Sequence, residues 1–169
     1  MDNSLSNLEV RMKYFSNSIL KFNPPAPEDA ISLAESKLGI KFCTQYRKFL
    51  HWHNGGRIIE VHLYGVQLVG TKLISKDLDI VARNLSNRSF EWWQQNWLEL
   101  GIDGFGNYFV ADLTHRNVLG ENTILFVDHE TLGGDTITSL RATSYFEFLY
   151  SILDEMIQIY DSNGNLKSD

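Results

Sequence analysis

Hydrophobic residues recur every three or four positions in the first third of the chain, which is the spacing of amphipathic helices. This pattern predicts helices over residues 8–19, 27–38 and 44–53. The proline-rich stretch 23–27 separates the first two helices because proline lacks the amide proton that a continuing helix needs. Glycines follow the second and third helices, and glycine is the residue that most often ends a helix.

Beyond residue 56 the hydrophobic period shortens to two, as in strands. Residues 77–84 interrupt this period and predict a short helix. Because the connections are short, the strands should pair mostly antiparallel. The predicted fold class is therefore α+β, with a central, mostly antiparallel sheet and flanking helices. The predicted strands are residues 58–64, 66–69, 96–100, 108–112 and 124–128.

A last helix is predicted near the C-terminal end of the chain. Ser144 and Glu147 have the spacing of a capping box, and a wide apolar face follows as far as Tyr160. Residues 161–169 contain one aliphatic side chain, Leu166, and are expected to fray. The chain has 169 residues, 43% of them hydrophobic, which suffices for one core. We therefore expect a single domain over residues 1–160 and a disordered tail over residues 161–169.

Three glycines lie among aromatic residues between positions 101 and 112. The Asp103-Gly104 and Gly106-Asn107 pairs supply residues that tolerate positive φ, and the alternating residues of a strand follow them. We therefore predict a tight turn within the sheet, in which Gly104 or Gly106 has φ above zero.

This stretch carries a resemblance to a known family. Residues 98–112 resemble the core motif of the SUKH superfamily, to which the Smi/Knr-type domains belong. Residues 34–56 resemble its opening motif, in which a helix, the letters LGI, a second helix and the letters NGG follow one another. Residues 124–130, a strand ending on His-Glu, and residues 144–149, the start of a helix, resemble its later motifs. The resemblance runs in order from about residue 27 to about residue 160. It departs from the family at 43–44, where Cys-Thr stands in place of a proline and an acid.

The superfamily contains bacterial toxin-immunity proteins and fungal cell-wall-assembly regulators. The resemblance therefore implies a non-catalytic, cytoplasmic immunity protein that binds and neutralises a cognate polymorphic toxin, such as a nuclease. A regulatory protein-interaction scaffold similar to the cell-wall-assembly regulators is the alternative function.

Charge divides the chain into two unlike halves. Residues 1–85 hold 11 basic and 8 acidic residues, net +3, whereas residues 86–169 hold 4 basic and 13 acidic residues, net −9. An acidic half repels the phosphates of nucleic acids, so we expect no direct nucleic-acid partner. It would suit a basic protein partner such as a toxin, although the carboxylates could equally form an ordinary solvated surface.

Cysteine content and the N-terminal residues bear on the compartment. Cys43 is the only cysteine, so the chain cannot form an internal disulfide and needs no oxidising environment. A catalytic role for its thiol would require a neighbouring base, and we expect a buried or helix-start residue instead. The first residues lack the features of a secretory signal, and no stretch approaches the roughly 20 apolar residues of a membrane span. We expect a cytoplasmic chain with no membrane partner.

Neither cofactor nor metal motifs are evident. The glycines at 101, 104 and 106 do not have G-x-G-x-x-G order, and no phosphate-binding loop is present. His51 and His53 point to different faces of their predicted helix, and His129-Glu130 is not followed by a second histidine in H-E-x-x-H order. We expect no cofactor and no metal.

One set of residues could perform acid-base chemistry if the strands brought it to one end of the sheet. A small hydrolase would use this cluster. In the alternative interpretation, which we favour, Asp103 and Asp128 bond turn amides while His129 and Glu130 cap a hairpin loop. No nucleophile or oxyanion element accompanies the acids, so the prediction is that the chain is not an enzyme. The set comprises Asp103, Asp112, Asp128, His129 and Glu130.

A dense aromatic segment supplies further candidates for partner contact. Exposed tryptophans dominate interface energetics, but sequence alternation places at least one of Trp92 and Trp93 in the core. The residues that we predict to contact a partner are Asp103, Glu121, Asp128, Glu130, Asp135, Trp92, Trp93 and Trp97.

Overall fold

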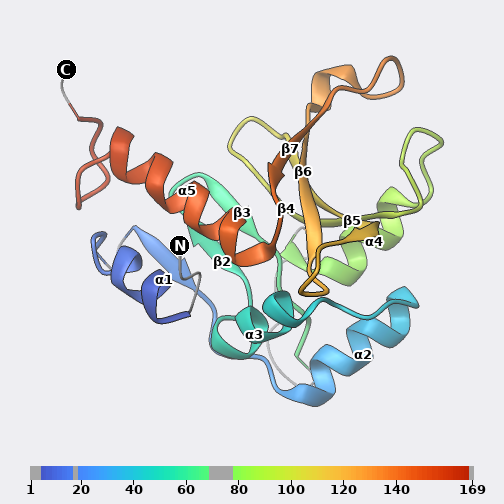
Figure 1. Ribbon diagram of the computed structural model, residues 1–169, viewed down its shortest axis with the longest axis horizontal. Helices are drawn as coiled ribbons and strands as arrows, with labels where there is room; N and C mark the ends of the chain where they lie inside the picture. Colours follow the sequence, from blue (N-terminus) through green and yellow to red (C-terminus); the bar gives the residue numbers. More distant parts are fainter. Residues whose placement is uncertain (1–4, 17–18, 69–77, 168–169) are drawn as a thin grey trace.

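The computed structural model describes residues 5–16, 19–68 and 78–167 (Figure 1). Helices and strands alternate irregularly along these residues. The helices are α1 (Leu5–Met12), α2 (Glu28–Leu38), α3 (Thr44–Trp52), α4 (Ile80–Asn87), α5 (Tyr145–Ile159) and the short 3₁₀ helix η2 (His129–Thr131). The strands are β1 (Leu20–Phe22), β2 (Gly56–Ile58), β3 (Val61–Leu63), β4 (Trp97–Ile102), β5 (Tyr108–Arg116), β6 (Asn122–Val127) and β7 (Thr138–Ala142).

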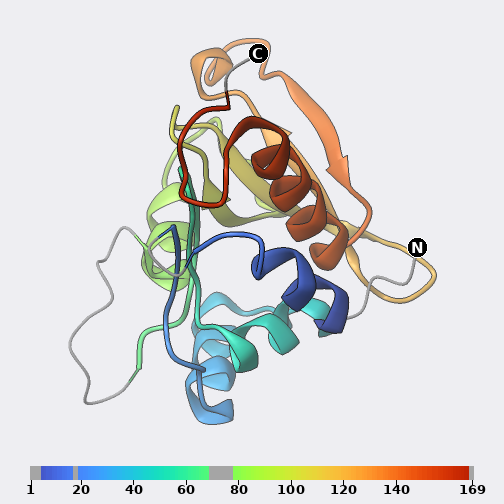
Figure 2. The same cartoon turned by 90° about the vertical axis from the view of Figure 1, so that its left-hand side faces the viewer.

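The seven strands form one sheet in sequence order, and each pairs antiparallel with its neighbours. Helices α1 and α5 pack against one another on one side of this sheet, whereas α4 lies against β4 on the other (Figure 2). The predicted α+β fold class is confirmed.

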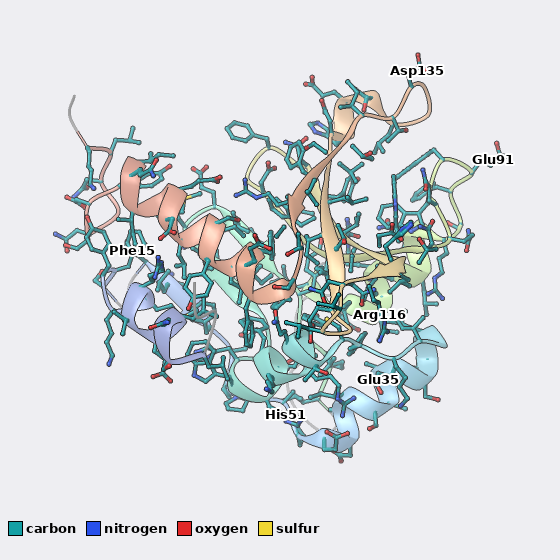
Figure 3. The ribbon with its side chains drawn as sticks, viewed as in Figure 1. Phe15, Glu35, His51, Glu91, Arg116 and Asp135 are labelled. Carbon is teal, nitrogen blue, oxygen red and sulfur yellow. The ribbon has the colours of Figure 1, made fainter. Side chains whose placement is uncertain are left out.

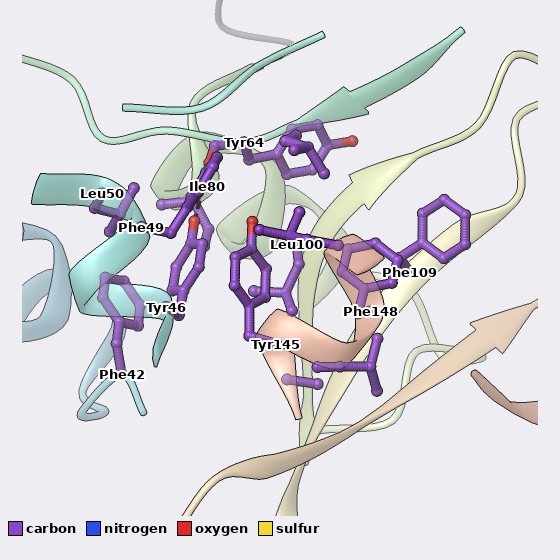
Figure 4. Close-up of a cluster of buried hydrophobic side chains, with 14 of the residues drawn as sticks. Phe42, Tyr46, Phe49, Leu50, Tyr64, Ile80, Leu100, Phe109, Tyr145 and Phe148 are labelled. Carbon is purple, nitrogen blue, oxygen red and sulfur yellow. Dashed lines mark hydrogen bonds between the residues drawn. The ribbon is translucent and has the colours of Figure 1, made fainter. Parts of the chain in front are cut away.

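The main core lies between the sheet and helices α3 and α5. Aromatic rings from α3, α5 and β5 meet there (Figure 4). The ring centroids of Tyr145 in α5 and Tyr46 in α3 lie 4.9 Å apart, as do those of Phe109 in β5 and Phe148 in α5. Phe148 is fully buried, so its replacement by alanine would cost about 3–5 kcal/mol. This packing fixes α5 against the strands that carry the functional loops described below.

A second, smaller core covers the opposite face of the central strands. The rings of Trp93 and Trp97 pack edge to face with their centroids 5.4 Å apart, in one cluster with Val110 and Val127. The pleat of the sheet explains the division, because successive residues of β5 alternate between the two faces.

Helix predictions were accurate where caps mark the ends. Helix α2 ends before Gly39, whose φ of 68° is left-handed, and α3 begins at Thr44 as expected. The first helix is shorter than predicted: it ends at Met12, and Phe15 is buried in the turn beyond it. The chain must reverse there because residues 20–22 form the unpredicted edge strand β1.

Strand predictions failed where a turn interrupts an apolar run. The predicted strand 58–64 is a hairpin of β2 and β3 joined at Ile59 and Glu60. Residues 66–68 form no strand, since Asn54 bonds the backbone of Val66 from its side chain, and residue 69 lies outside the described residues. The helix predicted over residues 77–84 corresponds to α4, which spans Ile80–Asn87 in the structure. Residue 77 lies outside the described residues.

The C-terminal region contains an unpredicted strand and a hydrogen-bonded turn. Strand β7 was not predicted because its exposed residues lack an alternating pattern. Residues 161–167 form a turn in which the Asp161 carboxylate accepts the amides of Asn163 and Asn165, and Lys167 N–H bonds the Ile159 carbonyl. The described part of the tail is therefore held against the end of α5, and residues 168–169 lie outside the described residues.

Candidate partner-binding surface

The glycine-rich turn between β4 and β5 is rigidly built by one aspartate. Asp103 Oδ1 accepts the backbone amides of Phe105 and Asn107, each at 2.9 Å, and Oδ2 accepts Asn107 Nδ2 at 2.9 Å. Gly106 has a φ of 93°, which confirms the prediction of a positive-φ glycine here. The turn presents Phe105 to solvent with 78% of its surface exposed.

The next turn along the sheet is tied to this one through Asn107. Its Oδ1 accepts the His129 amide at 3.2 Å and lies 2.9 Å from His129 Nδ1. Asp128 caps η2 by accepting the Glu130 amide at 2.9 Å. The predicted role of Asp103 and Asp128 in bonding turn amides is therefore confirmed, and both turns form one hydrogen-bonded unit.

A third turn, between β2 and β3, places Glu60 beside the first. Ile59 has a φ of 53°, a left-handed conformation that is rare for a β-branched residue and costs on the order of 1–3 kcal/mol. The approach to the glycine turn is close, because a Cβ added at Gly104 would lie 3.0 Å from Glu60 Cβ. The strained residue Ile59 thus lies in the turn that approaches the glycine-rich turn.

A pocket of about 170 Å³ opens beside these turns, between the sheet and α5. Phe105, Glu60 and Asp103 line one side of it, and Arg141 and Glu155 line another. The two Arg141–Glu155 hydrogen bonds are both 2.7 Å. Pockets for small-molecule ligands usually measure about 300–1,000 Å³, so this one is suited to a single side chain of a protein.

Carboxylates dominate the surface around the pocket. The exposed side chain of Phe105 lies among them. Figure 3 shows Asp135 at the outer end of the loop between η2 and β7, away from the body of the molecule. We call this region the acidic surface, and its carboxylates are those of Glu60, Asp103, Asp128, Glu130, Asp135 and Glu155.

Four of the predicted contact residues do not belong to this surface. Trp93 and Trp97 are only 3% and 2% exposed and fill the second core, which confirms that one of the paired tryptophans is buried. Trp92 is partly buried and stacks on the exposed Phe90 at 5.1 Å. Glu121 is 3% exposed, so the expectation that it is an exposed acid was wrong.

The burial of Glu121 has a structural cause. Both of its carboxylate oxygens lie 3.2 Å from the amide of Gln45, in the first turn of α3. A carboxylate is favourable at the positive end of a helix. Glu121 thus supplies from the β5–β6 hairpin the acid that the chain lacks at positions 43–44.

The acid-base set is not assembled in the structure. Asp112 pairs across the sheet with Trp97 and Thr123, well along β5 from the turn that holds Asp103. Burial acts to raise its pKa, but hydrogen bonds from Thr114, His115 and other neighbours outweigh burial and lower the pKa overall. Asp112 is therefore an ionised structural group, separate from the other four members.

Metal and thiol chemistry receive no support from the described residues. Over residues 5–16, 19–68 and 78–167 no group of three or more His, Cys, Asp and Glu side chains is placed to hold a metal ion. Cys43 is buried at the start of α3, and burial raises its thiol pKa to about 12. Its thiol is protonated and unreactive at neutral pH.

A buried polar network, unrecognised in the sequence, holds α4 to the sheet. Glu99 on β4 is fully buried, and its carboxylate accepts Tyr64 Oη at 2.6 Å, Arg83 at 3.0 Å and Asn87. Burial raises its pKa although Arg83 opposes this effect. The sequence signal was a glutamate between two buried leucines, Leu98-Glu99-Leu100. Its role is to position α4 rather than to contact a ligand.

Comparison with known proteins identifies the family. A family model described as SMI1 / KNR4 family (SUKH-1) matches residues 25–151. The chain belongs to this family. SMI1/KNR4 (SUKH-1) members are generally non-catalytic immunity or regulatory proteins, so membership supports a general role of that kind. The SUKH-1 match contains all three turns of the acidic surface, whereas Glu155 lies beyond it.

Two further findings complete the comparison. No curated protein matches the chain. Among the described residues, no helix has the length and apolar character required to cross a membrane.

Proposed function

We propose that this protein is a cytoplasmic immunity protein that neutralises a cognate polymorphic toxin, such as a nuclease, without catalysis. A single domain over residues 1–160 would carry this role. The observation that supports it most is the acidic surface, where Glu60 and Asp103 line a pocket beside the exposed Phe105 on hydrogen-bonded turns. A preorganised surface loses little conformational entropy on binding.

Charge and shape have separate parts in the proposed mechanism. The carboxylates attract a positively charged active site, and such steering raises association rates from about 10⁵–10⁶ to as much as 10⁸–10⁹ M⁻¹s⁻¹. Phe105 then supplies apolar contact, while the pocket lined by Glu60 and Asp103 receives one basic side chain. The bound protein blocks access to the toxin's substrate.

The experiment has two stages. The partner is first identified by copurification from the native cell and mass spectrometry, and its enzymatic activity is then assayed with and without the purified chain. Phe105→Asp should weaken inhibition by at least about tenfold, because aromatic anchors at interface centres are worth 2 kcal/mol or more. Phe90→Asp, a matched change at an exposed aromatic outside the acidic surface, should leave inhibition unchanged.

The outcomes distinguish immunity from the alternative role. A partner whose activity is unaffected by the bound chain would favour a regulatory scaffold similar to the cell-wall-assembly regulators. Equal loss of binding in the two phenylalanine variants would contradict the placement of the interface.

A further inference from the structure

The opposite face of the sheet carries two cations, Lys21 and Arg57, and a histidine in one cross-strand row. Lys21 of β1 pairs in register with Arg57 of β2, and Arg57 pairs with His62 of β3. Their strand neighbours, such as Ile58 and Leu63, are buried in the main core, so the pleat directs these three side chains to the other face. We call this set the basic row.

No carboxylate neutralises the basic row within the described residues. Lys21 and Arg57 form no ion pair with any residue in ranges 5–16, 19–68 and 78–167, and Arg57 Nε is buried without a hydrogen-bond partner. Burial and then the Arg57 charge lower the pKa of His62. Like charges directly opposite one another destabilise a sheet, so the arrangement favours binding rather than folding.

We propose that the basic row binds a short acidic segment of a protein partner. Adjacent strands lie about 4.8 Å apart, so the row extends over roughly 10 Å. Alternate residues of an extended peptide are separated by about 6.6–6.8 Å, which lets two carboxylates reach the row together. The Arg57 guanidinium can donate two hydrogen bonds to one of these carboxylates in a bidentate pair.

Size and total charge favour such a segment over a nucleic acid. The chain has a net charge of −6, and the acidic surface begins at Glu60, in the turn that joins β2 to β3. A long polyanion would extend past the row into this negative field, which reaches about 10 Å at 0.1 M salt. A segment with two or three carboxylates is confined to the cations. Figure 2 shows that α1 and α5 lie on the other side of the sheet from this face.

Binding can be measured by fluorescence anisotropy with a labelled peptide of alternating glutamate and glycine. The wild-type protein should bind it at 20 mM salt, and Arg57→Gln should raise the Kd at least about tenfold. The matched control is Lys48→Gln, which removes one exposed positive charge from α3 and should change the Kd less than about twofold.

Four other results would overturn the proposal. They are an equal loss of affinity in Lys48→Gln, tighter binding of a single-stranded oligonucleotide of equal charge, Arg57-dependent self-association without peptide, and absence of peptide binding. Arg57→Gln should also melt no lower than the wild type, because it relieves repulsion. A clear drop in its melting temperature would assign Arg57 a structural role instead.

Discussion

Replacing Gly106 with alanine tests whether the turn that presents Phe105 is fixed by backbone conformation. Gly106 has a φ of 93°, and left-handed conformations cost an L-residue roughly 1–2 kcal/mol. Space is not limiting, because the added Cβ would lie 3.8 Å from the nearest atoms of the His129 ring. Alanine also restricts the unfolded chain, which offsets about 0.4–1 kcal/mol of that cost. The midpoints of these two ranges give a net destabilisation of about 0.8 kcal/mol.

Thermal unfolding followed by circular dichroism measures this change. For a chain of this length each kcal/mol shifts the Tm by about 2–4 °C, so Gly106→Ala should melt about 2–3 °C below the wild type. Gly134→Ala is the matched control, since Gly134 lacks a positive φ and has only one atom, at 3.9 Å, near its added Cβ. An unchanged Tm for Gly106→Ala, or an equal fall in both variants, would refute the reasoning.

Three further predictions concern buried and titrating groups. Tyr145→Phe should leave the free energy of unfolding unchanged or raise it by about 1 kcal/mol, because the Tyr145 hydroxyl is buried without a partner. Tyr46→Phe should lower the free energy of unfolding by about 1 kcal/mol, because Tyr46 Oη donates to the Tyr64 carbonyl at 3.0 Å. Urea denaturation of both variants measures these changes. Because the pKa of Asp112 is lowered in the folded state, its carboxylate stabilises the fold at pH values above the ordinary aspartate pKa of about 3.9. This stabilisation is lost as the pH falls towards the folded-state pKa. The difference in unfolding free energy between wild type and Asp112→Asn should therefore be smaller at pH 3 than at pH 7. Arg57→Gln should raise the pKa of His62, which an NMR titration of its ring protons would detect; an unchanged pKa would contradict their proximity.

Elements with local signals were predictable from the sequence. Helices α2, α3 and α5 combine an apolar stripe with end signals, such as Gly39 after α2 and the Ser144 cap of α5. Strands β5 and β6 alternate clearly because one face packs on α5 and the other on the tryptophan core. In both cases the residues themselves carry the information.

Elements defined by distant partners were not predictable. Strand β1 has only three residues and is identified by its pairing with β2, and β7 is an exposed edge strand. The turn at Ile59 is hidden because a β-branched residue rarely adopts positive φ. For that reason, the sequence pattern predicted a single strand over residues 58–64.

The candidate surface was predicted in part. Asp103 and Asp128 were located through turn chemistry, which is local. Glu121 was misplaced because its burial depends on the amide of Gln45, 76 residues away in the sequence. The network around Glu99 was missed for the same reason, since its partners come from α4 and from Tyr64.

The proposed function requires that the acidic surface attract a basic protein partner. The most direct measurement is the association rate of the purified chain with its copurified partner at 0.1 M and 1 M salt, where the screening length falls from about 10 Å to about 3 Å. We predict a steep fall with salt and a further decrease of about tenfold at low salt for Glu130→Lys with Asp135→Lys. The matched control, Glu9→Lys on the exposed side of α1, should associate as the wild type does. A rate that is independent of salt, or equal sensitivity to all three reversals, would contradict the claim.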